Sequence, residues 1–203
     1  MKAMLDRLLE LGLLADCACV LTGYFAQAEQ VAIAADFVAM LGARIPELYL
    51  LCDPVLGDDD ALYVKEEIAA AIRDRLVPLA QGLMPNVFEA SWLSGLDVGN
   101  LDNAERAARR WPDKDVVVTS IPEGADRLAT ALFAGGKSIV ASRARLANVP
   151  HGTGDLLSGL LAGHIARRDA LDTSFSDAMR KLDQAIAVSR GSDCLDLVRG
   201  LSS

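Results

Sequence analysis

A short glycine-rich turn, Gly152-Thr153-Gly154-Asp155, holds the residues of this sequence that are best suited to chemistry. Residues 156–165 follow it with the period of a buried helix, so the turn lies at a helix N-terminus. The first amides of a helix have no partner within it and could hold a phosphate. Asp155 could instead accept a proton from a hydroxyl that attacks that phosphate. The alternative is that Thr153 or Asp155 only caps the helix.

Other polar residues follow runs of apolar residues that are typical of strands. They are Asp53, Asp58, Asn86, Glu89, Thr119 and Ser120. Because ligands of parallel sheets bind beyond the carboxyl ends of the strands, we expect these residues to share one site with the turn. Asn86 and Glu89 lie on one helix face and could hold a hydrated Mg²⁺ between them. Two structural alternatives remain open, a capping box formed by Asn86 and Glu89 and a simple turn that contains Asp53 and Asp58.

The elements that must position these residues alternate along the chain. Helical periodicity is found in residues 5–14, 27–41, 65–76, 102–111, 153–168 and 174–190, and strand patterns in residues 17–21, 48–52 and 116–119. Residues 127–133 and 137–141 predict a hairpin around Gly135-Gly136. Strands that are buried on both faces and alternate with helices indicate an α/β domain with a parallel sheet.

Length and composition limit the class of protein. A chain of 203 residues predicts a single domain, residues 1–203, and a hydrophobic content of 52% excludes a disordered chain. A net charge of −8 argues against nucleic acid and anionic membranes as partners, so phosphate would be bound locally by amides and a metal ion. Cys17, Cys19 and Cys52 lie in apolar runs, where we expect buried free thiols. Such thiols, with no apolar run long enough to span a membrane, favour a cytoplasmic location.

Several of these segments together resemble the pyridoxal kinases of the ribokinase-like superfamily. The segments are Thr22-Gly23-Tyr24, Asp53-Pro54-Val55-Leu56-Gly57-Asp58 with Leu62-Tyr63-Val64, Pro85-Asn86-Val87-Phe88-Glu89 with Leu93-Ser94-Gly95, Val117-Val118-Thr119-Ser120 and Gly152-Thr153-Gly154-Asp155. The last segment and the Asn-x-x-Glu pair are common to the superfamily, whereas the first two segments are more specific to pyridoxal kinases. The resemblance covers essentially the whole chain and implies a ribokinase-like three-layer fold with a mostly parallel central sheet.

The resemblance also implies an activity, the ATP-dependent phosphorylation of the 5′-hydroxymethyl group of pyridoxal, pyridoxine and pyridoxamine in vitamin B6 salvage. Asp155 would contact the substrate as catalytic base, and the amides of Gly152, Thr153 and Gly154 would form the anion hole. Glu89 and Asp53 would serve Mg²⁺, and a monovalent cation could also bind. The implied nucleotide-binding residues are Asp53, Asp58, Asn86, Glu89, Thr119, Ser120, Leu146, Ala147 and Asn148, the last three beside the adenine. Tyr24 would face the pyridine ring, and the full-length family is expected to form homodimers.

The sequence departs from the family pattern in two places. Met84 stands where relatives usually carry threonine, which removes a hydroxyl next to the expected phosphate site. The family's opening β-α segment is not found, so we expect an N-terminally truncated domain with an open sheet edge and an incomplete substrate pocket. These departures keep three alternatives open: another ribokinase-like kinase such as a hydroxymethylpyrimidine kinase, a non-catalytic ATP-binding remnant, and a structural partner that pairs through its sheet edge.

Overall fold

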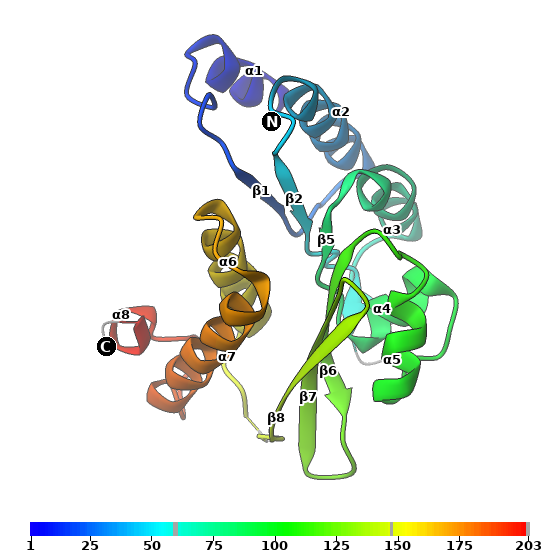
Figure 1. The fold of residues 1–203 in the computed structure, drawn as a ribbon, viewed down its shortest axis with the longest axis vertical. Coiled ribbons are helices and arrows are strands. Elements are labelled where there is room, and N and C mark those ends of the chain that lie inside the picture. The colour runs from blue at the N-terminus through cyan, green and yellow to red at the C-terminus, as the bar shows by residue number, and fades with distance from the viewer. Residues whose placement is uncertain (59–60, 147, 202–203) are drawn as a thin grey trace.

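The computed structural model describes residues 1–58, 61–146 and 148–201 and is built on a six-stranded sheet with the strand order β1-β2-β5-β6-β7-β8 (Figure 1). The strands are β1 (Cys19–Thr22), β2 (Tyr49–Cys52), β5 (Gly82–Leu83), β6 (Asp115–Pro122), β7 (Arg127–Ala134) and β8 (Lys137–Ala144). The first four strands are parallel, and β7 and β8 form an antiparallel extension. A separate two-stranded ribbon joins β3 (Gly57–Asp58) to β4 (Ala61–Leu62). The predicted α/β class and the predicted hairpin are confirmed.

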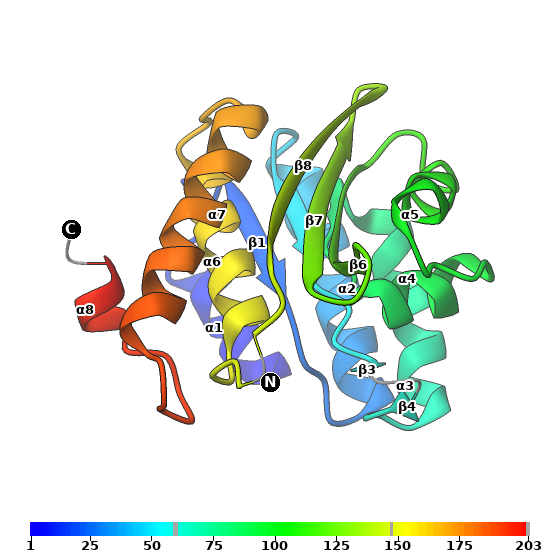
Figure 2. The ribbon, with the colours of Figure 1, turned by 90° about the horizontal axis from the view of Figure 1, so that it is seen from below.

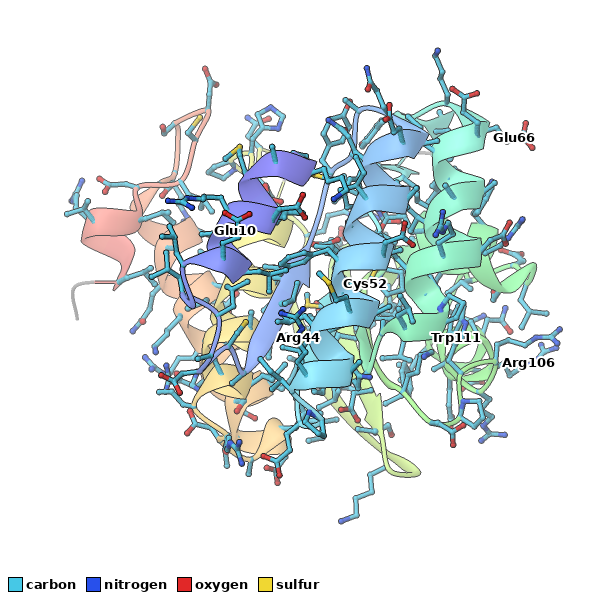
Figure 3. The ribbon with its side chains drawn as sticks, turned by 90° about the horizontal axis from the view of Figure 1, so that it is seen from above. Glu10, Arg44, Cys52, Glu66, Arg106 and Trp111 are labelled. Carbon is cyan, nitrogen blue, oxygen red and sulfur yellow. The ribbon has the colours of Figure 1, made fainter. Side chains whose placement is uncertain are left out.

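Helices cover both faces of the sheet and give the domain its three layers (Figures 1 and 2). One face carries α2 (Ala28–Arg44), α3 (Glu66–Ala71), α4 (Val87–Ser94) and α5 (Leu101–Ala108), and the other carries α6 (Thr153–Ala166) and α7 (Leu171–Val188). The remaining helices are α1 (Lys2–Glu10), η1 (Ile72–Leu76), η2 (Val77–Leu79) and α8 (Leu197–Leu201). Figure 3 shows charged side chains such as Glu66 and Arg106 at the periphery, whereas Cys52 lies in the interior.

The valines of β6 explain why both faces of the sheet are covered. Val116 and Val118 pack into the core formed with α2 to α5, and Val117 packs into the core formed with α6 and α7. Successive side chains of a strand point to opposite faces, so an unbroken apolar run needs a helical layer on each side. This is the physical basis of the prediction of a parallel sheet.

Four local predictions need correction. The helix expected over residues 5–14 begins earlier and already ends at Glu10 as α1. Residues 65–76 were expected to form one α-helix, but α3 ends at Ala71 and the last turn is the π-helix η1. The strand expected over residues 116–119 continues to Pro122 across an irregularity between Val118 and Ile121, because pairing with β7 extends it. All four cysteines are free, but Cys17 and Cys19 are only partly buried, because β1 lies at the edge of the sheet and pairs with β2 alone among the described strands.

None of the helices in the described ranges combines the length and the apolar character that a membrane span requires.

Candidate active site

A cavity of about 340 Å³ opens where the carboxyl ends of β2, β5 and β6 meet the N-terminus of α6. Its lining residues come from segments that are far apart in the sequence. They are Asp53, Val55, Gly57, Asp58, Tyr63, Met84, Asn86, Glu89, Thr119, Val149, Pro150, His151, Gly152, Thr153, Gly154 and Asp155. The fold therefore brings the glycine-rich turn together with most of the polar residues that were expected to join it.

The start of α6 presents free backbone amides to this cavity. The N-cap is Gly152, in the left-handed conformation with φ of 90°, and no side chain caps the first turn. The His151 amide donates to Asp193 O at 2.9 Å and fixes the preceding loop. A helix start without a capping side chain leaves its amides available to an anion. The alternative in which Thr153 or Asp155 serves as the N-cap is wrong, because Gly152 occupies that position.

Asn86 and Glu89 form the capping box that the sequence left open as an alternative. The Glu89 amide donates to Asn86 Oδ1 at 2.9 Å, and the Asn86 amide donates to Glu89 Oε2 at 2.8 Å. The pair also anchors the neighbouring loop, since the Leu56 amide donates to Glu89 Oε1 at 2.9 Å and Asn86 Nδ2 donates to Gly57 O at 2.8 Å. Among the described residues only the Asn86 amide donates to Glu89 Oε2, and a carboxylate oxygen can accept two bonds, so this structural role leaves a lone pair for a cation.

The acidic residues of the cavity are held in a poorly solvated environment. Burial raises the pKa of Glu89 to about 8 against the opposing effect of the backbone amides, and the charge of Asp53 raises it further. Burial also raises the pKa of Asp53 to about 6, and the charge of Asp155 acts in the same direction. Burial is the main cause of both shifts, and no lysine or arginine lines the cavity in the described part of the chain to oppose it.

The donor set suits Mg²⁺ bound together with phosphates better than a metal ion held by protein alone. Among the described residues, no three histidine, cysteine, aspartate or glutamate side chains are grouped closely enough to hold a metal ion. Mg²⁺ is commonly bound by one or two carboxylates plus substrate phosphates, and Asp53 and Glu89 are carboxylates of the same cavity.

Some predicted site residues lie outside the lining of this cavity. Tyr24 follows β1 with 64% of its surface exposed, and Ser120 lies in the irregular part of β6 with φ of 61°. Leu146 packs against the core of α6 and α7, and Asn148 is exposed. Ala147 lies outside the described residues. Their predicted contacts with nucleotide or substrate remain predictions.

Sequence reasoning missed two kinds of site residue. Val55 and Tyr63, which belong to the resembling segments but were given no role, line the cavity together with Val149 and Pro150, which lie in no such segment. Ser158 lies beneath the cavity, where its hydroxyl donates to Asp53 Oδ2 at 2.5 Å. Its spacing of three residues from Asp155 on one helix was the only signal that could have identified it.

The layered sheet and the position of the cavity define a three-layer α/β domain of the ribokinase-like class. The sequence model of the phosphomethylpyrimidine kinase family matches residues 8–195, and the chain belongs to this family.

Relatives within this family are pyridoxal kinases. The chain is 36% identical over 188 residues to the pyridoxine/pyridoxal/pyridoxamine kinase of Bordetella avium, a match that covers 88% of this chain and 63% of that protein. It is 35% identical over 153 residues to the pyridoxal kinase of Arabidopsis thaliana, covering 71% of this chain and 49% of the relative. The chain thus spans less than two thirds of the length of these relatives.

Solved structures agree with this placement. The crystal structure of pyridoxal kinase from Entamoeba histolytica matches with a TM-score of 0.89 and 25% identity, over 97% of this chain and 72% of that one. Pyridoxal kinase from Leishmania donovani in complex with ADP and pyridoxamine matches with a TM-score of 0.83 and 31% identity, over 97% of this chain and 71% of that one.

Proposed function

We propose that this protein transfers the γ-phosphoryl group of ATP to the 5′-hydroxymethyl group of pyridoxal, and also of pyridoxine and pyridoxamine. The observation that carries the proposal is the position of Asp155, in the first turn of α6 beside uncapped amides and inside the acidic cavity. Asp155 takes the proton from the attacking hydroxyl, which makes that oxygen a better nucleophile. The amides of Gly152, Thr153 and Gly154 stabilise the charge that develops on the transferred phosphoryl group.

The proposal includes Mg²⁺, which would neutralise the phosphates and stabilise the transition state when bound. Asp53 and Glu89 would hold it, with Asp58 and Asn86 placing the ATP phosphates. The charge of the cavity supports this role, since four carboxyl groups and no lysine or arginine line it in the described part of the chain. A polyphosphate could enter such a cavity only with a cation, and a monovalent cation belongs to the same proposal.

The remaining assignments rest on the family resemblance. Thr119, which lines the cavity, and Ser120 would contact the nucleotide, and residues 146–148 would border the adenine. Tyr24 would face the pyridine ring. A cytoplasmic location and a homodimer, as expected for the full-length family, complete the proposal.

An assay of the 203-residue chain with Mg-ATP and pyridoxal tests the function, with pyridoxal phosphate followed by absorbance. We expect Asp155→Asn to lower kcat about 10²- to 10⁴-fold, the usual contribution of a general base, while Mg-ATP binding measured by calorimetry changes little. The matched control is Asp172→Asn, which changes an aspartate in the first turn of α7 outside the cavity. We expect this control variant to keep full activity. Near-native turnover of Asp155→Asn would refute the assigned base. Binding of ATP without product in the unsubstituted chain would instead support the non-catalytic remnant.

A hydroxymethylpyrimidine kinase is the second candidate, favoured by the family model that the chain matches. Both reactions phosphorylate a hydroxymethyl group on a nitrogen heterocycle, so the same base and anion hole would serve. Measuring kcat/KM for pyridoxal, pyridoxine, pyridoxamine and hydroxymethylpyrimidine separates the two candidates. A preference for the pyrimidine would replace the first proposal with the second.

A further inference from the structure

We propose that Ser158 is a positioning residue, which holds the Asp53 carboxylate in place within the cavity that Asp155 also lines. This inference rests on the proposed function, in which Asp53 is a ligand of Mg²⁺. The Ser158 hydroxyl donates to Asp53 Oδ2 at 2.5 Å, and the residue is 1% exposed. In the described part of the chain, no other donor is hydrogen-bonded to the Asp53 carboxylate.

The fold gives this single bond its importance. Ser158 lies on the buried face of α6 between Leu157 and Leu161, whose side chains are locked into the core with α7. Asp53 directly follows β2 and is 105 positions away in the sequence. The bond therefore ties the loop after β2 to the helix that carries the proposed base one turn earlier, at Asp155.

The surrounding charges explain why a tether is needed. Asp53 is buried near two other carboxyl groups, since the charge of Asp155 adds to burial in raising the pKa of Asp53, and the charge of Asp53 adds to burial in raising the pKa of Glu89. Like charges at close range favour a rotation of the Asp53 side chain away from its neighbours. A well-packed donor opposes that rotation and leaves the second carboxylate oxygen, Oδ1, free for a cation.

The hydroxyl has a second acceptor within reach, Gly154 O at 2.9 Å, but only one proton to donate. A charged acceptor forms the stronger bond, so the proton goes to Asp53 whenever that carboxyl group is ionised. The Gly154 carbonyl, one residue before Asp155, fixes the direction of the hydroxyl within the first turn of α6. Ser158 thus orients the Asp53 side chain, and the Asp53 carboxylate would in turn orient the Mg²⁺ ion.

Ser158→Ala tests the inference, with Ser158→Thr as the variant that retains the hydroxyl. The control is Ser174→Ala, because Ser174 is also 1% exposed and its hydroxyl bonds back to Ala170 O at 2.7 Å, on α7 and outside the cavity. The main measurement is the affinity of the 203-residue chain with bound ADP for Mn²⁺, used in place of Mg²⁺ and followed by electron paramagnetic resonance. Steady-state kinetics give kcat and the KM for pyridoxal on the same samples.

We expect Ser158→Ala to weaken Mn²⁺ binding about 10- to 100-fold, as is usual for residues that orient metal ligands, with the KM for pyridoxal unchanged. Ser158→Thr should restore most of the affinity, and Ser174→Ala should leave it unaltered. In an Asp53→Asn background, Ser158→Ala should cause no further loss, because the two residues act as one unit. A merely structural serine would not produce this pattern.

Unaltered Mn²⁺ affinity in a folded Ser158→Ala protein would overturn the inference and leave the proposed function standing. If the unsubstituted chain binds neither Mn²⁺ nor ADP, the proposed function fails and the inference fails with it. If Ser158→Ala does not fold by thermal melting, Ser158→Cys takes its place, since a thiol has a similar size and is only a weak donor. Full affinity in that variant would overturn the inference as well.

Discussion

Glu89 makes the stability of this protein depend on pH in an unusual direction. Its side chain is 4% exposed, and burial raises its pKa from 4.5 to about 8. Between these two values the unfolded chain releases the Glu89 proton while the folded chain keeps it. The free energy of unfolding therefore falls as pH rises from about 4.5 to 8, and this one group contributes at most about 5 kcal/mol across the window.

The perturbation is Glu89→Gln, which keeps the shape of the side chain but replaces the ionisable carboxyl group by an amide that does not titrate. In the variant, the NH₂ group of the glutamine faces one of the two backbone N–H groups, at Leu56 or Asn86, and leaves it without an acceptor. This loss lowers the free energy of unfolding by about 1 to 3 kcal/mol at every pH. Only the pH-dependent part of the stability difference therefore reports the pKa. Asp53, whose pKa is raised from 3.8 to about 6, titrates in both proteins and largely cancels in the comparison.

The assay is urea denaturation of both proteins at several pH values from 4.5 to 8.5, without nucleotide and with a chelator, because a bound cation favours the ionised carboxylate. The stability advantage of the unsubstituted chain over Glu89→Gln should shrink as pH rises. Glu105→Gln is the control, since Glu105 is an exposed partner of Arg109 on α5. An equal pH dependence in the unsubstituted chain and in Glu89→Gln would refute the reasoning about burial.

Two further predictions concern the loop that Glu89 anchors, and both are measured by urea denaturation at pH 7. Asn86→Ala removes the N-cap of α4 and the bond to Gly57 O, and we expect a loss of about 1 to 3 kcal/mol; an unchanged midpoint would contradict the importance of the cap. Gly57→Ala places a methyl group against the Ala61 carbonyl oxygen and 2.6 Å from Phe88 Cε1, so we expect a loss of about 1 to 3 kcal/mol from overpacking. Gly42→Ala, where no atom lies within 4 Å of the added methyl group, is the control that should lose no stability to overpacking.

Much of the fold was predictable because its signals are local. The periodicity of residues 27–41 predicted α2, and the run of valines predicted a strand covered on both faces. The π-helix η1 was not predictable from the same kind of pattern. Ile72 and Leu76 are both buried four residues apart, and this spacing is equally typical of an α-helix.

The candidate site was predictable in its motifs but not in its connections. The sequence identified Asp53, Asn86, Glu89 and Asp155 because each follows a strand or begins a helix. It could not show that Glu89 supports the loop at Leu56, or that the Ser158 hydroxyl contacts Asp53. The sequence also grouped Tyr24 with these residues, although Tyr24 does not line their cavity. A motif records order along the chain and not distance in space.

The sequence by itself determined the elements, the class of fold and the residues that could do chemistry, because hydrophobic periodicity and helix-end chemistry act over a few neighbouring residues. Tertiary structure alone decided which of those residues share a cavity and how strongly burial and like charges shift the pKa values of Asp53 and Glu89. Those properties depend on the packing of α6 against β1 and β2, which unites residues that are about half the chain apart.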